Sequence, residues 1–145
     1  QIVGDTLPEY QKYLDELKLD IKQKGLNNKI KFLGFRDDVI SILNKSNFFI
    51  HTPLSPDPFP TVVFEAIKCK TPVITNNLGG AFEILDQGKN GLIIKNDLVK
   101  ESVEKIFSYL ENKNLQKKNT EKAFDYVSIK FKYETFKKKI LNTIE

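Results

Sequence analysis

The chain has 145 residues, of which 40% are hydrophobic and 29% charged, and its formal net charge is +4. This composition is typical of one soluble globular domain with a single core. No run of about 18 apolar residues occurs, and the start "QIVGDTLPEY" lacks the pattern of a signal peptide, which argues against a membrane span and against secretion.

Cysteine and methionine usage give two further expectations. Cys69 is the only cysteine, which excludes an internal disulfide and fits a reducing compartment, so we expect a cytoplasmic location. Methionine is absent. Because a natural chain starts with methionine, we expect a fragment of a longer protein, with processing as the alternative, and we treat residues 1–145 as one domain.

Short apolar runs alternate with longer amphipathic segments. In chain order we expect a strand at 1–4, a helix from a Thr6–Glu9 capping box to Gly25, a strand at 29–34, a helix from Asp37 or Asp38, a strand at 47–52, a helix at 61–69, a strand at 72–75, a short helix at 81–85, a strand at 91–94 and two closing helices. Such alternation, with continuous apolar strands, is typical of a parallel sheet covered by helices on both faces.

The loops after the strands are the candidate ligand-binding segments, because open parallel sheets bind ligands at the carboxyl ends of their strands. They include "GFRDD", "TPLSPDPFP" and "NNLGG". Behind the proline-rich loop, Thr61 is a good N-cap for a helix whose free N–H groups and positive dipole end bind phosphate readily. Asp57 and Glu65 are separated by seven residues, and we expect both acids to line one crevice.

Each of these features also has a simpler structural interpretation. Asp57 could cap a turn, and Glu65 could pair with Lys68 or Lys70 on a surface helix. The pair Gly79–Gly80 could let the backbone approach a ligand closely, or it could form only a tight turn.

The remaining titratable residues give little sign of catalysis or metal binding. His51, the only histidine, stands at the end of an apolar strand, where a structural role is more common than catalysis. The pair Asp37–Asp38 resembles a metal-binding pair, but a helix start explains it as capping. No cluster of histidine, cysteine and acid has the spacing of metal ligands. We therefore expect no metal site.

Positive charge is concentrated near the C-terminus. From Lys113 onward the chain holds nine lysines and four acidic residues. Apolar residues recur among them at helical spacing, which favours a helix with one packed and one solvated face and argues against a nucleic-acid partner. These residues are Phe131, Phe136, Ile140 and Ile144. The lysines at 137–139 leave open a peripheral contact with an anionic membrane surface.

The stretch "DPFPTVVFEAIKCKTPVITNNLGGAFEILDQGKNGLII" resembles the nucleotide-sugar-binding domain of the retaining glycosyltransferases of family 4, which have the GT-B fold. The hallmark of that family is an acid, seven residues and a glutamate, followed by a "PVI...GG..E" run and by "NGL". The segments "VGD", "KFLGFRDDV" and "SNFFIHTPLS" match the same domain in the same order. The resemblance implies an α/β fold with a Rossmann-like, doubly wound parallel sheet, the C-terminal half of a GT-B enzyme without its first βα unit.

The resemblance also implies a role for each residue of the motif. Glu65 would accept hydrogen bonds from the ribose hydroxyls. Asp57 would be the catalytic-site acid that faces the hydroxyls of the transferred sugar. Backbone N–H groups around Phe59, Thr61 and Val62 would meet the sugar and the diphosphate. The residues expected beside the base are Gly34, Phe35 and Arg36.

Three residues depart from the family's pattern. Asp57 replaces the usual glutamate and is shorter by one methylene. Pro60 stands where glycine is common and removes one N–H donor. Lys70 occupies a position usually given to glycine. These departures leave open the donor sugar and one contact with the sugar or phosphate.

The implied reaction transfers a sugar from a UDP-, GDP- or ADP-sugar to an acceptor hydroxyl with retention, in glycan or cell-surface polysaccharide synthesis. No metal would be needed, because a helix N-terminus and cations stabilise the leaving phosphate. An acceptor domain for a glycan or lipid-linked acceptor, and a loop whose arginine and lysine hold the diphosphate, would precede this chain. By itself the chain would bind the donor only and be inactive, in the cytoplasm or at the inner face of the membrane. The alternative is a stand-alone nucleotide-binding or regulatory module.

Overall fold

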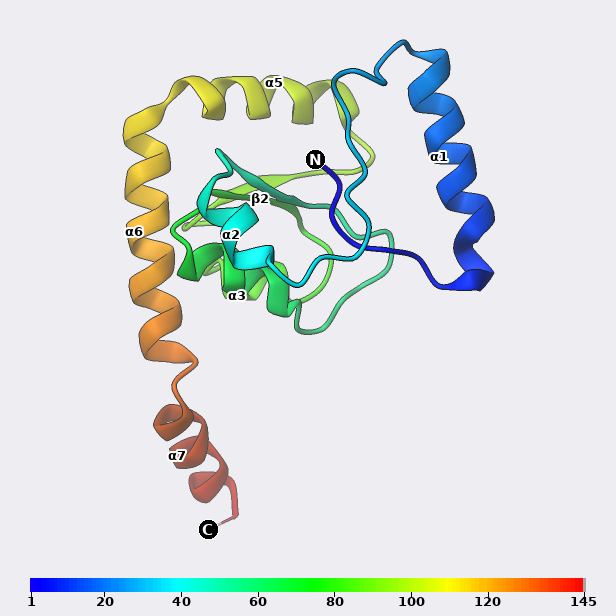
Figure 1. Cartoon of the computed structure of the whole chain (residues 1–145). Helices are drawn as coiled ribbons and strands as arrows, with labels where there is room; N and C mark the ends of the chain where they lie inside the picture. The colour runs from blue at the N-terminus through cyan, green and yellow to red at the C-terminus, as the bar shows by residue number, and fades with distance from the viewer. Residues whose placement is uncertain (145) are drawn as a thin grey trace. The chain divides into compact units, whose positions relative to one another are not determined.

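The chain forms two compact units, Gln1–Val39 and Ile40–Glu145 (Figure 1). The structure is a computed structural model that describes residues 1–144, with the side chains of Lys139, Thr143 and Ile144 outside the description. None of the described helices is both long and apolar enough to cross a membrane.

The first unit is built around one helix. A single 3-10 turn, Pro8–Tyr10 (η1), leads into α1, Gln11–Gln23. Leu7 precedes the first turn and no side chain caps it, so the predicted Thr6–Glu9 capping box is wrong. The reason is local, because the Thr6 N–H donates to Asp5 Oδ1 at 2.8 Å, ahead of the helix.

The two strands predicted in the first unit are not formed, and a single isolated bridge stands in their place. Ile2 and Phe32 form an isolated parallel bridge. Beside it the Gly4 N–H donates to the Gly34 carbonyl at 2.9 Å. Both glycines have positive φ, 121° and 63°, so the backbone turns away and the pairing does not extend into strands.

The second unit contains the parallel sheet that the sequence predicts. Its strands are β1 (Phe49–His51), β2 (Val73–Asn76) and β3 (Leu92–Ile94), paired in the order β1-β2-β3. The helices of the rest of the chain are α2 (Val39–Asn44), α3 (Thr61–Lys68), α4 (Ala81–Ile84), α5 (Val99–Glu111), α6 (Lys113–Lys130) and α7 (Tyr133–Ile144).

The core lies around β2, whose four residues are all buried. Successive side chains of a strand point to opposite faces, so both faces of the sheet are covered. Ile74 packs with Ile94 and with Tyr109 of α5. From α3, the fully buried side chains are Val63, Ala66 and Ile67. The helix α6 in turn packs against α3 and α5. The predicted α/β class is confirmed.

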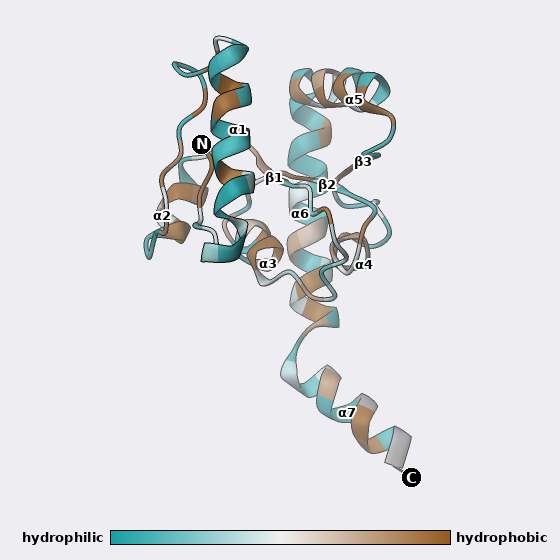
Figure 2. Ribbon diagram, turned by 90° about the vertical axis from the view of Figure 1, so that its right-hand side faces the viewer, coloured by the Kyte–Doolittle hydropathy of each residue, from teal (hydrophilic) through white to brown (hydrophobic). Residues whose placement is uncertain are grey.

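Three helices, where two were predicted, follow β3 in the described chain. The break between α5 and α6 is set by Asn112, whose Oδ1 accepts the Leu115 N–H at 2.9 Å. The expected packed face holds for Phe131, which is half-buried, and is wrong for Phe136 and Ile140, which are exposed. Figure 2 shows hydrophobic stretches along α7. The side chain of Ile144 lies outside the described residues.

Candidate functional site

The loops at the carboxyl ends of the three strands are joined by the side chain of Asn76, the last residue of β2. Asn76 is 1% exposed. Its Nδ2 donates to the Pro53 carbonyl at 2.9 Å and to Asn96 Oδ1 at 3.1 Å, and its Oδ1 accepts the Leu78 N–H at 3.2 Å. One amide therefore fixes the loops after β1, β2 and β3. Asn76 was not among the site residues predicted from the sequence, although a polar residue at the end of an apolar strand was the available signal.

The proline-rich loop after β1 packs against Gly79 and Gly80. Asp57 and Gly79 form a parallel bridge, and the Gly80 N–H donates to the Asp57 carbonyl at 2.8 Å. Gly79 has a φ of 84°, and a Cβ on Gly80 would lie 2.1 Å from the Pro58 carbonyl oxygen. The glycine pair thus serves both a left-handed turn and a close backbone approach. The backbone that it approaches is the protein's own loop.

The carboxylate of Asp57 turns back onto its loop. Its Oδ1 accepts the Phe59 N–H at 3.0 Å, two residues further on, as in an Asx turn. Within residues 1–144, Oδ2 accepts no hydrogen bond. The turn-forming role of Asp57 is therefore confirmed, and one carboxylate oxygen remains for a ligand.

The helix α3 begins at Thr61, so its N-cap is Pro60 and the prediction of Thr61 as the cap is wrong by one residue. Buried Pro60 has an extended backbone, and its carbonyl accepts the Val63 N–H at 3.1 Å. No side chain caps this helix. The N–H groups of Thr61 and Val62 lack intrahelical acceptors and lie at the positive end of the helix dipole. This arrangement suits an anion such as phosphate.

Half-buried Glu65 lines a cavity of about 530 Å³ bounded by residues of α3 and α6. The other lining residues, mostly aromatic or aliphatic, are Phe59, Thr61, Phe64, Ile67, Lys68, Phe124, Val127, Ser128 and Phe131. Asp57 is not one of them, since its carboxylate turns toward the Phe59 N–H. The two acids therefore do not line this cavity together.

The alternative in which a lysine neutralises Glu65 is wrong. Among the described residues Glu65 forms no ion pair, and the Lys70 ammonium lies over the ring of Phe124, 5.3 Å from its centroid. Lys70 itself has a φ of 54°. That conformation favours glycine, which accounts for the glycine that the resembled family carries at this position. Glu65 is left as an unpaired acceptor.

The residues expected beside a base lie in the first unit. Gly34 has positive φ, and Phe35 is 79% exposed. Arg36 donates from Nε and Nη2 to the two oxygens of Asp38, both at 2.8 Å, and this contact raises the pKa of Arg36. Residues 1–144 contain no group of three or more histidine, cysteine, aspartate or glutamate side chains placed to hold a metal.

His51 ends β1 in a partly buried position. Its ring stacks on Phe49 with centroids 6.2 Å apart, and its Nδ1 is buried without a hydrogen-bond partner in the described chain. Burial lowers the pKa of His51 below its ordinary value of 6.5, while the nearby charge of Asp57 opposes the shift. A neutral, packed imidazole agrees with the structural role predicted for it.

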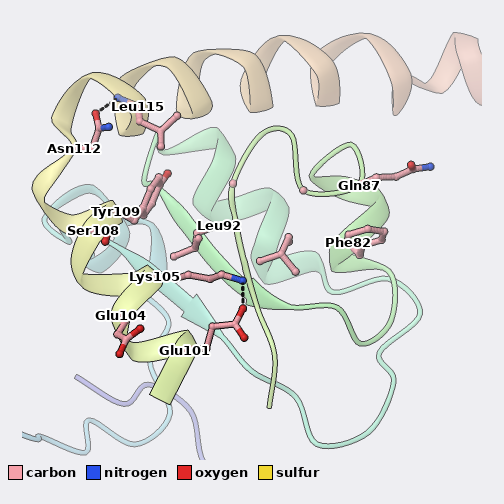
Figure 3. Close-up of a pocket in the computed structure, with 13 residues that line it drawn as sticks. Phe82, Gln87, Leu92, Glu101, Glu104, Lys105, Ser108, Tyr109, Asn112 and Leu115 are labelled. Carbon is pink, nitrogen blue, oxygen red and sulfur yellow. Dashed lines mark hydrogen bonds and ion pairs between the residues drawn. The ribbon is translucent and has the colours of Figure 1, made fainter. Parts of the chain in front are cut away.

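A second hollow, an open groove of about 740 Å³, lies beside β3 (Figure 3). Leu92 lines it together with residues of α5, among them Tyr109, whose pKa is raised by burial. Lys105 and Glu101, which also line it, form an ion pair of 2.6 Å (Figure 3). None of the site residues predicted from the sequence lines this groove.

Comparison with known proteins shows the family to which this fold belongs. The model of the glycosyl transferases group 1 family matches residues 1–126. The chain belongs to this family. The solved glycosyltransferases to which the chain is similar have the GT-B fold, which supports the GT-B assignment of this fold.

Two curated relatives illustrate the match of this group 1 glycosyltransferase domain. The uncharacterized glycosyltransferase MJ1178 of Methanocaldococcus jannaschii is 33% identical over 107 residues, covering 72% of this chain and 30% of the relative. The N-acetylgalactosamine-N,N'-diacetylbacillosaminyl-diphospho-undecaprenol 4-alpha-N-acetylgalactosaminyltransferase of Campylobacter jejuni is 30% identical over 122 residues, covering 79% and 33%. The chain thus spans about a third of the length of these relatives.

Among solved structures, HepE of Anabaena superposes with a TM-score of 0.85 and 32% identity, over 98% of this chain and 39% of HepE. HepE has been crystallised with UDP and with UDP-glucose. The lipopolysaccharide glycosyltransferase WaaG, at 19% identity and a TM-score of 0.71, shares the fold over 88% of this chain and 33% of WaaG.

We expect Asn76→Ala to lower the free energy of unfolding by roughly 2–4 kcal/mol, because unmade buried hydrogen bonds cost about 1–3 kcal/mol each. Chemical denaturation measures this. The matched control is the neighbouring Asn77→Ala, whose exposed side chain should change stability by less than about 0.5 kcal/mol. Equal stability of the two variants would contradict the role of Asn76 in joining the loops.

The lowered pKa of His51 predicts a pH-dependent stability. The unfolded histidine binds a proton more readily than the folded one, so this residue's contribution is fully present above about pH 6.5 and is lost as the pH falls through the folded pKa. Thermal unfolding at pH 7.5 and 5.5 should show a smaller loss of Tm for His51→Gln than for the unaltered protein. An identical loss in both proteins would refute the assignment.

Proposed function

We propose that this chain is the donor-binding part of a retaining family 4 glycosyltransferase, which transfers a sugar from a nucleoside diphosphate sugar to an acceptor hydroxyl. The observation that supports this most is the unpaired, half-buried Glu65 within α3, a helix whose N-terminus is uncapped by any side chain. An anion site and a hydroxyl-binding acid on the same helix suit the two parts of a nucleotide that adjoin, the diphosphate and the ribose.

The diphosphate would be bound by the first residues of α3. The N–H groups of Thr61 and Val62 are free of intrahelical acceptors. Pro60 has no N–H, and the Phe59 N–H already donates to Asp57. The chain's phosphate contacts are therefore confined to the helix end, and Phe59 would join them only if Asp57 released it.

The base and the sugar would be bound by the two other loops that the sequence singles out. Asp57 would use its free oxygen on the sugar hydroxyls, and Gly34, Phe35 and Arg36 would lie beside the base. The crystal structures of HepE with UDP and UDP-glucose support a uridine donor in preference to a guanosine or adenosine donor. The 32% identity supports the same class of donor, not the identity of the sugar.

The reaction would break the bond between the anomeric carbon and the leaving diphosphate oxygen and join that carbon to the acceptor oxygen with retention, while the proton of the acceptor hydroxyl passes to the leaving diphosphate. Negative charge grows on the leaving diphosphate, at the positive end of α3. Cations from the rest of a longer protein would add to this stabilisation, so the proposal needs no metal cofactor.

The acceptor would be a glycan or a lipid-linked glycan held by another domain, at the cytoplasmic face of the membrane. The name of the Campylobacter jejuni relative contains a glycosylated diphospho-undecaprenol, which supports a lipid-linked glycan as the acceptor. On α7, exposed Phe136 and Leu141 accompany Lys137 and Lys138, which is the combination found in helices that touch anionic membrane surfaces.

We expect Glu65→Gln to weaken UDP binding by roughly 1–3 kcal/mol, because the amide removes charge from the hydrogen bonds to the ribose. Isothermal calorimetry with UDP measures the loss. Glu134→Gln on α7, where the glutamate is exposed, is the matched control and should bind like the unaltered protein. Unchanged UDP affinity of a folded Glu65→Gln variant would refute the ligand-binding role and leave Glu65 as an ordinary residue of a surface helix.

Asp57→Asn should weaken binding of UDP-glucose while sparing UDP, since the acid is expected to touch the sugar alone. The asparagine keeps an oxygen that can accept the Phe59 N–H, so the turn is preserved and only the charge is removed. Calorimetry with both ligands separates the contributions. Equal losses for the two would favour a stand-alone nucleotide-binding module over a transferase site.

A further inference from the structure

The last turn of α6 contacts the two segments on which the donor site is built. The ring of Phe131, the residue that ends α6, lies 6.0 Å from the ring of Phe59 and 5.0 Å from that of Phe64, measured between centroids. Phe59 and Phe64 are themselves 4.8 Å apart. Phe131 thus joins the proline-rich loop and α3 in one aromatic cluster, in the geometries that aromatic pairs prefer.

Lys130, next to Phe131, connects the same turn to α4. Its ammonium forms an ion pair of 3.2 Å with Glu83 of α4 and a hydrogen bond of 2.6 Å with the Tyr126 hydroxyl. It also lies over the rings of Tyr126 and Phe131, 5.0 and 5.6 Å from their centroids. The hydrogen bond with Tyr126 raises the pKa of Lys130. The end of α6 therefore contacts α3, which follows the proline-rich loop, and α4, which follows the glycine pair.

The contact with Phe59 matters because of what Phe59 does. Its N–H donates to Asp57 Oδ1, while its side chain is 53% exposed. A side chain so exposed is held by few neighbours, and the rings of Phe64 and Phe131 are the aromatic ones among the described residues. Phe131 also walls the cavity that Glu65 lines. Loss of its ring would free the turn that orients Asp57 and would open the wall opposite Glu65.

We propose that Phe131 is a positioning residue for donor binding, which holds the Asp57–Phe59 turn through ring contact from the end of α6. This inference rests on the proposed function. Phe131 itself need not touch the donor. It lies outside residues 1–126, the part of the chain that the family model matches.

The first measurement is hydrogen exchange by NMR without any ligand. The amides of Phe59 and Gly80 both donate to Asp57, at 3.0 and 2.8 Å, and report directly on the turn. Phe131→Ala should speed their exchange about tenfold, whereas the Phe49 amide, which donates to the Pro72 carbonyl beside the sheet, should keep its rate. Phe136→Ala, on exposed α7, is the control and should change none of the three.

The second measurement is calorimetry of the same variants with UDP and UDP-glucose. Phe131→Ala should weaken binding about tenfold, Phe131→Tyr should restore it because the ring is kept, and Phe131→Leu should fall between them. Rescue by a ring, with the Phe49 amide unchanged, separates positioning from a general loss of stability. Should Phe131→Ala fail to fold, the comparison of Phe131→Leu with Phe131→Tyr carries the same test.

Three results would overturn the inference. Unchanged exchange of Phe59 and Gly80 in Phe131→Ala would show that the ring does not hold the turn. Faster exchange with undiminished donor affinity would show that the turn does not position the donor. Absence of UDP and UDP-glucose binding by the unaltered protein would refute the proposed function and, with it, the positioning role. This outcome can be told apart from a failure of the ring contact, because the hydrogen-exchange experiment uses no ligand.

Discussion

The hydrogen bonds of Asn76 are the constraint on which the rest of the site depends. A parallel sheet pairs its strands but leaves the loops beyond their carboxyl ends to be fixed by other means. An amide offers donors and an acceptor in one rigid group, which is enough to bind one partner in each of three loops. A leucine of similar volume would fill the space and leave three polar groups without partners. Buried polarity at this position is thus a requirement of the architecture.

The hydrogen bonds of Asn76 also allow the backbone contacts that position Asp57. With Pro53 and Leu78 held to Asn76, the loops after β1 and β2 lie close enough for Gly80 to donate to Asp57. That contact tolerates no Cβ at Gly80. It places the Asp57 turn directly ahead of α3. The position of the acid is therefore determined by the loop's neighbours, and its own side chain only completes the turn.

Sequence patterns predicted the elements whose cause is local. The apolar runs at 72–75 and 91–94 are strands, and α3 begins within one residue of its expected start, since apolar periodicity and proline act over a few residues. The capping box at Thr6 failed for a local reason, the hydrogen bond from the Thr6 N–H to Asp5, whereas the error over Glu65 involves a partner distant in sequence. Lys70 contacts Phe124 and leaves Glu65 unpaired, and sequence spacing does not predict that contact. The hydrogen bonds of Asn76 to three loops likewise cannot be predicted before the strands are placed side by side.

Glu65 lies one turn inside the helix that carries it. It is the fifth of the eight residues of α3, and the helix dipole acts mainly within the first turn, so the positive N-terminal end remains available to an anion. An anion placed directly against Glu65 would instead meet an unpaired carboxylate. Neutral hydroxyls beside Glu65 avoid the conflict, and anionic oxygens fit further out, at the N–H groups of Thr61 and Val62. Hydroxyls beside Glu65 and phosphates at the helix end would follow the order of groups in the nucleoside diphosphate that we propose as the ligand.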